Sequence, residues 1–136
     1  MGGQTKLQAR QVGFTLIELM VVVTIVAILM AVALPAFNSQ MMKGHRAAAQ
    51  AEMMEIANKQ QQYLLSNRAY TTTLIDIGYS LPTDVGDRYT PAIDNSTCAP
   101  SPCFTITFTA KDSQVDDGGP LTLNHLGEQG PMGYWN

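Results

Sequence analysis

The chain has 136 residues, a formal net charge of −3 and only 14% charged residues, and its length is that of a single domain. Without residues 1–13, which contain Lys6 and Arg10 and no acidic residue, the net charge falls to −5. Such an acidic chain lacks the basic stripe that nucleic-acid-binding proteins use, so direct binding of nucleic acid is not expected.

Residues 14–37 are almost wholly apolar and carry one formal charge, on Glu18. A helix needs about 20 apolar residues to span the hydrocarbon core of a bilayer, so this stretch is long enough. The apolar core of a secretory signal peptide is shorter, at about 7–15 residues. A carboxylate inside a membrane helix costs about 2.5–3.5 kcal/mol and normally has a partner. Glu18 is therefore the first functional candidate, and a plain membrane anchor leaves it unexplained.

The sequence GFTLIE at residues 13–18 resembles the processing site of bacterial type IV prepilins. The resemblance implies that residues 1–13 are a leader peptide, which a prepilin peptidase removes by cutting between Gly13 and Phe14. The same enzyme would then methylate the new N-terminal amine of Phe14. The two basic residues of the leader fit a cytoplasmic position under the positive-inside tendency.

The resemblance also assigns assembly roles to Phe14, Glu18 and Pro35. Cleavage creates an ammonium group on Phe14, and Glu18 of a neighbouring subunit can supply the matching anion. Two buried charges satisfy each other only when the subunits are in register, so the pair would act as an assembly key. Pro35 removes a backbone hydrogen bond and so kinks or loosens the helix. In pilins the helix can lose regular structure near this proline within the filament; a marker of the membrane exit is the simpler alternative.

Residues 38–66 predict an amphipathic continuation of the same helix, because strong helix formers dominate and no proline interrupts them. Apolar side chains recur at spacings of three and four residues, which indicates one buried stripe. The stripe comprises Met42, Ala49, Met53, Ile56 and Tyr63, and passes through Gln60. The face expected to be polar bears Arg46, Gln50, Lys59 and Gln62.

Residues 67–102 are rich in Pro, Asp, Thr, Gly and Asn, and predict a connecting region with little regular structure. Parts of this region, residues 67–71 and 74–79, resemble the helix-to-sheet connection of E-type minor pilins. Cys98 and Cys103 flank the sequence Ala-Pro-Ser-Pro. In an oxidising compartment they are expected to form a disulfide that closes a tight loop, with two free thiols as the alternative.

Residues 103–136 predict a small antiparallel sheet and a C-terminal flap. Residues 103–110 alternate strictly between apolar and polar, which is typical of a half-buried strand. The side chains expected on its buried face are Phe104, Ile106, Phe108 and Ala110. Residues 121–124 predict a second strand after a turn at residues 112–119, and residues 132–135 a short closing strand or flap anchored by Trp135.

The C-terminal region also resembles E-type minor pilins, with one departure. Many of those proteins join a cysteine just before the Leu-Thr-Leu strand to another just before the terminal Trp. Here Gly119 and Tyr134 occupy the two places, so that disulfide is absent.

No motif for catalysis or for a cofactor occurs in the sequence. Asp112, Asp116 and Asp117 suggest a calcium loop like that of the major pseudopilins, but they lack the alternate spacing of calcium ligands. The two histidines, His45 and His125, lie far apart in the sequence and are expected to be solvated. We expect no enzymatic activity, no cofactor and no metal site.

The expected fold class is α+β: the type IV pilin fold, with a long N-terminal helix whose first half is transmembrane, packed on a small antiparallel sheet. The expected function is that of a structural subunit of a type IV pilus, a minor rather than a major pilin, polymerising through its N-terminal helix. Adhesion, twitching motility and DNA uptake all remain open as outputs. The alternatives are a pseudopilin of a type II secretion system and a membrane-anchored binding domain that does not polymerise.

The expected partners are other pilin subunits, a prepilin peptidase and the inner-membrane assembly platform. Before assembly the chain would be a single-pass protein of the bacterial inner membrane with a periplasmic C-terminal domain. After assembly it would be part of the extracellular pilus.

Overall fold

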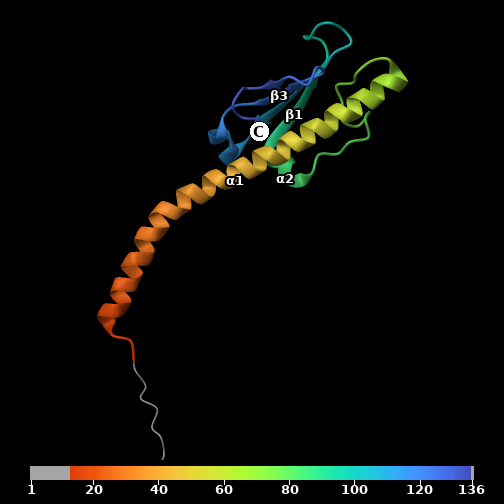
Figure 1. Ribbon diagram of the computed structural model, residues 1–136. Coiled ribbons are helices and arrows are strands. Elements are labelled where there is room, and N and C mark those ends of the chain that lie inside the picture. Colours follow the sequence, from red (N-terminus) through yellow and green to blue (C-terminus); the bar gives the residue numbers. More distant parts are fainter. Residues whose placement is uncertain (1–12, 136) are drawn as a thin grey trace, which may run out of the picture. The chain divides into compact units, whose positions relative to one another are not determined.

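The computed structural model describes residues 13–135. The chain divides into two units, residues 1–37 and residues 38–136, and each is described by itself. Helix α1, Leu16–Asn67, is 52 residues long and contributes to both units (Figure 1). The long N-terminal helix that the sequence predicts is therefore confirmed.

The second unit contains a four-stranded antiparallel sheet with the order β1-β2-β3-β4, in which each strand pairs with the next one along the chain. The strands are β1 (Tyr89–Asp94), β2 (Thr105–Ala110), β3 (Leu121–Asn124) and β4 (Gln129–Gly130). Two short helices accompany them, α2 (Thr83–Gly86) and the 3-10 helix η1 (Asp112–Asp117). The pairing of β1 with β2 extends over six residues, from Tyr89 opposite Ala110 to Asp94 opposite Thr105.

The core of the second unit lies between α1 and one face of the sheet (Figure 1). From α1, the stripe residues Ala49, Met53 and Ile56 are fully buried, as their spacing predicts. Phe104 and the alternate residues of β2 face them, with exposed fractions of at most 1%. Those residues of β2 are Ile106 and Phe108.

Gln60 fastens the chain that follows α1 back onto the helix. Its side chain is fully buried, and its Nε2 donates a hydrogen bond of 2.6 Å to the carbonyl oxygen of Thr71. The backbone N–H of Thr71 donates in return to Oε1 of Gln60 at 3.1 Å. A buried carboxamide is tolerated when its donor and acceptor are both used, so this polar residue can interrupt an apolar stripe.

The connecting region contains more regular structure than the sequence predicts. Strand β1 lies within residues 67–102, whereas the sheet was expected to begin at residue 103. Pro91 hides this strand from pattern recognition, because proline cannot donate to a ladder of hydrogen bonds. Since β1 is an edge strand, it tolerates the proline.

The C-terminal region also differs from the prediction. Of the two alternatives predicted for residues 132–135, the closing strand is wrong: these residues form no strand, and the last strand is β4, at Gln129–Gly130. Pro131 follows β4 directly and has no N–H to extend the ladder, and Gly133 turns the chain with a φ of 92°. The predicted turn at residues 112–119 contains the 3-10 helix η1.

Candidate functional site

The first candidate site is the start of α1. Thr15 precedes the helix, and its Oγ1 accepts a hydrogen bond of 3.3 Å from the backbone N–H of Glu18. The spacing Thr-x-x-Glu is that of a capping box, in which the hydroxyl satisfies one free N–H of the first turn. The negative charge of Glu18 also lies in the first turn, where the helix dipole favours it. Glu18 therefore has a local structural role that the sequence reasoning missed, although the Thr-x-x-Glu spacing was there to find.

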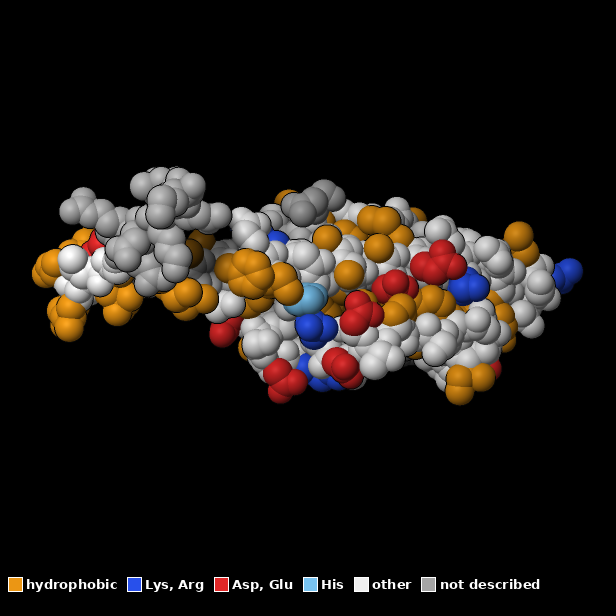
Figure 2. Space-filling view, turned by 90° about the horizontal axis from the view of Figure 1, so that it is seen from below, with side chains coloured by type: hydrophobic (Ala, Val, Ile, Leu, Met, Phe, Trp, Pro, Cys, Tyr) orange, Lys and Arg blue, Asp and Glu red, His pale blue; other side chains and the backbone are white. Residues whose placement is uncertain are grey.

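The apolar half of α1 has no cover within the chain that the structure describes. Every residue from 13 to 38 is exposed, and hydrophobic side chains gather on the surface of this segment (Figure 2). By length and composition, α1 is the one described helix able to cross a membrane, with a mean hydropathy of 2.8 in its most apolar window. Phe14 is 83% exposed and Gly13 has open space around it, while Pro35 lies inside the helix.

The second candidate site is a polar cluster that connects α1, η1 and the C-terminal segment. Arg46 donates from Nε to Oδ2 of Asp117 at 2.6 Å, and its Nη2 forms an ion pair with Oδ1. The two side chains are only 13% and 10% exposed, and the pairing with the Asp117 carboxylate raises the pKa of Arg46. A bidentate pair in this environment is both strong and directional.

Tyr134 joins the cluster through its ring and its backbone. The guanidinium of Arg46 lies 4.9 Å from the centre of the Tyr134 ring, within range of a cation–π interaction. Gln50 donates to the carbonyl oxygen of Tyr134 at 2.6 Å. Gly118 lies against the same ring, and a Cβ atom at position 118 would collide with ring atoms of Tyr134. A glycine at this position therefore leaves room for the Tyr134 side chain. We call Arg46, Gln50, Asp117 and Tyr134 the polar clamp.

The burial of two members of the polar clamp differs from what the sequence predicts. Arg46 and Gln50 were assigned to the polar face of the helix, yet Gln50 is 5% exposed and Arg46 is half-buried. Gln114 of η1 supports the clamp: it is 2% exposed and donates to Asp117 at 3.0 Å and to the carbonyl oxygen of Met42 at 2.9 Å. The clamp holds Tyr134 at the place where many E-type minor pilins carry a disulfide cysteine.

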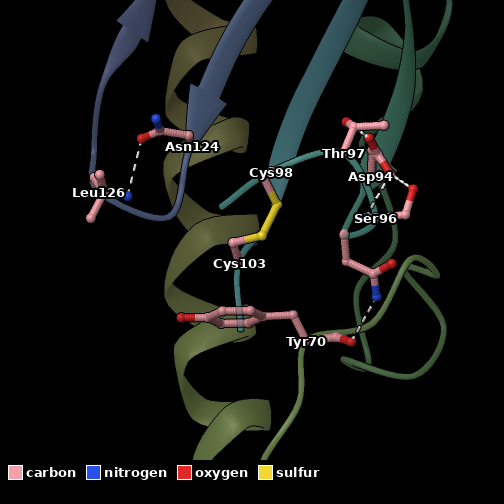
Figure 3. Close-up of a disulfide and its surroundings, with 9 residues drawn as sticks. Tyr70, Asp94, Ser96, Thr97, Cys98, Cys103, Asn124 and Leu126 are labelled. Carbon is pink, nitrogen blue, oxygen red and sulfur yellow. Dashed lines mark hydrogen bonds between the residues drawn. A yellow bond between two sulfur atoms is a disulfide. The ribbon is translucent and has the colours of Figure 1, made fainter. Parts of the chain in front are cut away.

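The third candidate site is the loop after β1. Cys98 and Cys103 form a disulfide with their Cα atoms 5.9 Å apart, as the sequence predicts (Figure 3). Beside it, the carboxylate of Asp94 accepts hydrogen bonds from the backbone N–H of Ser96 at 2.9 Å, from the hydroxyl of Ser96 at 2.7 Å and from the hydroxyl of Thr97. The bond from Thr97, followed by those from Ser96, lowers the pKa of Asp94 to about 2.

The acidic residues of η1 do not gather around a common point. Asp117 is engaged by Arg46 in the polar clamp. Within residues 13–135, no group of three or more His, Cys, Asp or Glu side chains is arranged to hold a metal ion.

Two family models match the chain. Residues 35–122, more than half of the chain, match the family described as "Type IV minor pilin ComP, DNA uptake sequence receptor". Residues 9–34 match the prokaryotic N-terminal methylation motif, which covers the predicted processing site.

Three curated proteins are similar in sequence. The chain is 26% identical over 148 residues to the type IV major pilin protein PilA of Myxococcus xanthus, covering 97% of this chain and 66% of that protein. It is 34% identical over 90 residues to the type IV wide pilus major component PilA4 of Thermus thermophilus, covering 63% and 69%. A fimbrial protein of Neisseria meningitidis is 36% identical over 89 residues, covering 62% and 49%. The chain thus spans about half to two thirds of the length of these relatives.

The fold is similar to that of a solved type IV pilin from Shewanella oneidensis. The TM-score is 0.56 at 21% sequence identity, and the match covers 70% of this chain and 98% of that one. The α+β pilin fold predicted from the sequence is therefore confirmed. The chain is a type IV pilin, a structural subunit of the pilus, and belongs to the family of the type IV minor pilin ComP.

Proposed function

We propose that this chain is a minor pilin that is processed between Gly13 and Phe14 and enters the filament through residues 14–37. The single observation that carries the proposal is the apolar half of α1, which is exposed along its whole length and begins at a methylation motif. A prepilin peptidase removes the leader and methylates Phe14, and the inner-membrane assembly platform then moves the subunit into the pilus. Before assembly the second unit lies in the periplasm, where oxidising conditions suit the Cys98–Cys103 disulfide.

The central chemical step is the pairing of Glu18 with the processed amine of Phe14 on a neighbouring subunit. Within the residues that the structure describes, Glu18 takes part in no ion pair. In an apolar filament core an unpaired carboxylate is strongly unfavourable, whereas a paired one is tolerated. Pairing therefore selects the register of the subunits. Pro35 weakens the helix locally and gives the filament a place to extend.

The two alternative functions receive less support. A pseudopilin of type II secretion would share the architecture, but the named relatives are pilus or fimbrial proteins. A membrane-anchored binding domain would need no methylation motif. We therefore place the chain in a pilus.

DNA uptake is a second candidate function, favoured by the description of the family as a receptor for DNA uptake sequences. The net charge of −5 without residues 1–13 opposes direct binding, and one of the six cations of that part, Arg46, is held by Asp117. A DNA-binding surface needs several free cations, and its affinity falls steeply with salt. We propose that this subunit does not itself bind DNA. Saturable binding of duplex DNA at 150 mM salt, with a log–log salt slope of several units, would establish the opposite.

Mass spectrometry of filaments sheared from the cell surface tests the main proposal. The expected result is an N-terminal peptide that begins with N-methylated Phe14, at a low level beside a more abundant pilin. An abundant methylated peptide would make this chain the major subunit. Processed protein found only in the inner membrane would support the pseudopilin. A chain that retains residues 1–13 would overturn the proposal.

A further inference from the structure

The second unit contains a cleft beside the first residues that α1 contributes to it. The volume of the cleft is about 420 Å³, within the range of about 300–1,000 Å³ for small-molecule sites. Asn38, Met41, Met42 and His45 line it from α1, at the three- and four-residue spacings that place them on one side of the helix. The rest of the lining consists of Arg88, which precedes β1, and of residues of η1.

Side chains of both charges line this cleft. Arg88 supplies a guanidinium and Asp116 a carboxylate, and within the residues that the structure describes neither takes part in an ion pair. Nη1 of Arg88 donates to the carbonyl oxygen of Asp84 at 2.7 Å, which fixes the side chain and uses only one of its N–H groups. His45 adds an imidazole; it is half-buried, as is His125, although both were expected to be solvated.

The position of the cleft along α1 is that of lipid headgroups. Residues 16–37 extend about 33 Å at 1.5 Å per residue, which matches the hydrocarbon core of a bilayer, about 30 Å thick. The headgroup layer adds about 5–8 Å on each side of that core. The next five residues of α1 rise by about 7 Å, so Asn38, Met41 and Met42 lie in this layer while residues 16–37 span the membrane.

The lining matches a phospholipid headgroup that joins a phosphate to a primary ammonium. The planar N–H fork of an arginine suits a phosphate, and Arg88 offers one. The carboxylate of Asp116 and the hydroxyl of Ser113 can accept hydrogen bonds from the ammonium. Met41 and Met42 add adaptable apolar surface for the glycerol and the first carbon atoms of the acyl chains.

Two other common headgroups fit this lining less well. A choline headgroup carries the phosphate, but its quaternary ammonium has no N–H to donate to Asp116. A glycerol headgroup leaves the negative charge of the phosphate without a compensating ammonium, beside the carboxylate of Asp116, and like charges repel.

We propose that this cleft binds the headgroup of phosphatidylethanolamine in the periplasmic leaflet of the inner membrane. The phosphate is bound by Arg88 and His45, and the ammonium by Asp116. The inference rests on the proposed function, because the cleft meets headgroups only while the apolar half of α1 spans the membrane. It adds a lipid partner for the stage before assembly, which the subunit gives up when it leaves the membrane for the filament.

A lipid titration of the full chain in phosphatidylcholine nanodiscs, followed by NMR, tests the proposal. Phosphatidylethanolamine or phosphatidylglycerol replaces a rising share of the phosphatidylcholine. We expect saturable shifts of the Arg88 side-chain N–H signal and of the Ser113 and Asp116 amide signals with phosphatidylethanolamine. Phosphatidylglycerol should need an at least about fivefold higher mole fraction for the same shifts, because its negative charge meets Asp116 without an ammonium. Inorganic phosphate at millimolar concentration, the probe for a free anion, should not reproduce the shifts.

Two variants and one control decide which groups bind the lipid. Arg88→Gln removes the charged fork and should raise the half-saturating mole fraction of phosphatidylethanolamine at least about tenfold. Asp116→Asn changes an exposed side chain, so the fold is kept, and it should abolish the preference for phosphatidylethanolamine over phosphatidylglycerol. Lys43→Gln is the matched control, because Lys43 is an exposed cation of α1 that does not line the cleft, and its titration should equal that of the native chain.

The outcomes separate this inference from the proposed function. A chain that enters the nanodisc but shows no saturable shift with phosphatidylethanolamine would overturn the lipid site alone. Equal weakening in Arg88→Gln and Lys43→Gln would also overturn it, since general surface charge would then explain the binding. The same shifts with inorganic phosphate would replace the lipid by a free anion. A chain that does not enter the nanodisc would contradict the membrane step of the proposed function, and this inference with it.

Discussion

The two halves of α1 form one continuous helix but are stabilised in different ways. In residues 38–67, the apolar stripe is covered by the sheet of the same chain, and Met53 and Ile56 are fully buried. In residues 16–37 the apolar side chains are exposed in the chain itself, among them Ile25 at 52% and Leu29 at 64%. The apolar stripe of residues 38–67 is therefore buried by the fold of the chain itself. The apolar side chains of residues 16–37 must instead be covered by a bilayer or by neighbouring subunits.

The size of the exposed apolar surface explains why this difference has functional consequences. Burial of apolar surface stabilises by about 25 cal/mol per Å², so a helix turn left in water forgoes several kcal/mol. A contiguous apolar surface of this extent marks a site of interaction. The comparison implies that mutations in the two halves affect different properties: stability of the second unit in one case, and assembly in the other.

The largest expected effect on folding comes from Phe108→Ala, in the core of the second unit. The side chain is fully buried, and its loss should reduce the free energy of unfolding by about 3–5 kcal/mol. Ile25→Ala, in the apolar half, should leave the same quantity unchanged. Urea denaturation of the full chain in micelles, followed by fluorescence of Trp135, measures both. Equal losses of unfolding free energy in the two variants would contradict the distinction between the two halves of α1.

Arg46→Ala should destabilise the second unit by about 2–4 kcal/mol, because it leaves the half-buried carboxylate of Asp117 without its partner. Lys43→Ala is the matched control: it removes an exposed positive charge three residues earlier and should change stability by less than about 0.5 kcal/mol. The same denaturation experiment applies. A similar loss in both variants would mean that net charge, and not the polar clamp, stabilises the C-terminal segment.

Replacing both cysteines of the disulfide by serine should cost about 2 kcal/mol, since the closed loop is short. Reduction of the native chain should produce the same loss, which separates the effect of the bond from that of the substitutions. Hydrogen exchange should show faster exchange near the loop after β1 and unchanged protection in α1. Faster exchange throughout the second unit would show that the disulfide holds the whole core.

The smallest expected effect is a dependence of this loop on pH. The hydrogen bonds to the carboxylate of Asp94 lower its pKa to about 2, from an ordinary value of 3.8. A lowered pKa in the folded state contributes stability above the ordinary value, which is lost as the pH falls toward the folded value. NMR signals of Ser96 and Thr97 should therefore stay constant down to about pH 3 and change around a midpoint of about pH 2. Asp94→Asn should remove the change, whereas a midpoint at the ordinary value of 3.8 in the native chain would contradict the account.

The sequence predicts the features that depend on local pattern. The helix follows from helix formers and a continuous stripe, β2 from strict alternation, and the disulfide from two cysteines with a short spacing. The processing site and the position of Glu18 are recognisable because they are consecutive in the chain. Each of these signals lies within a few dozen residues.

What the sequence does not predict depends on contacts between distant residues. Arg46 and Asp117 are 71 positions apart, and nothing in either neighbourhood marks them as partners. The burial of Gln50 depends on Tyr134, which lies 84 positions later. Strand β1 is not predicted from the sequence, because Pro91 interrupts the strand pattern. The proline is tolerated because β1 lies at the edge of the sheet, and this position follows only from the pairing of the strands.

The central claim is that the charge of Glu18 directs the assembly of the apolar half. Glu18→Gln tests it most directly, because glutamine keeps the size of the side chain and its ability to accept hydrogen bonds and removes only the charge. The measurement is the amount of this subunit in sheared filaments, compared between Glu18→Gln, Glu18→Ala and the control Glu55→Gln, which changes an exposed carboxylate in the second unit.

We expect both Glu18 variants to be incorporated at least about a hundredfold less than the native chain, since an unpaired buried charge costs about 3–5 kcal/mol, and we expect Glu55→Gln to be normal. Normal incorporation of Glu18→Gln together with failure of Glu18→Ala would show that Glu18 acts through the size and hydrogen bonding of its side chain and not through its charge, and would contradict the charge-pairing account.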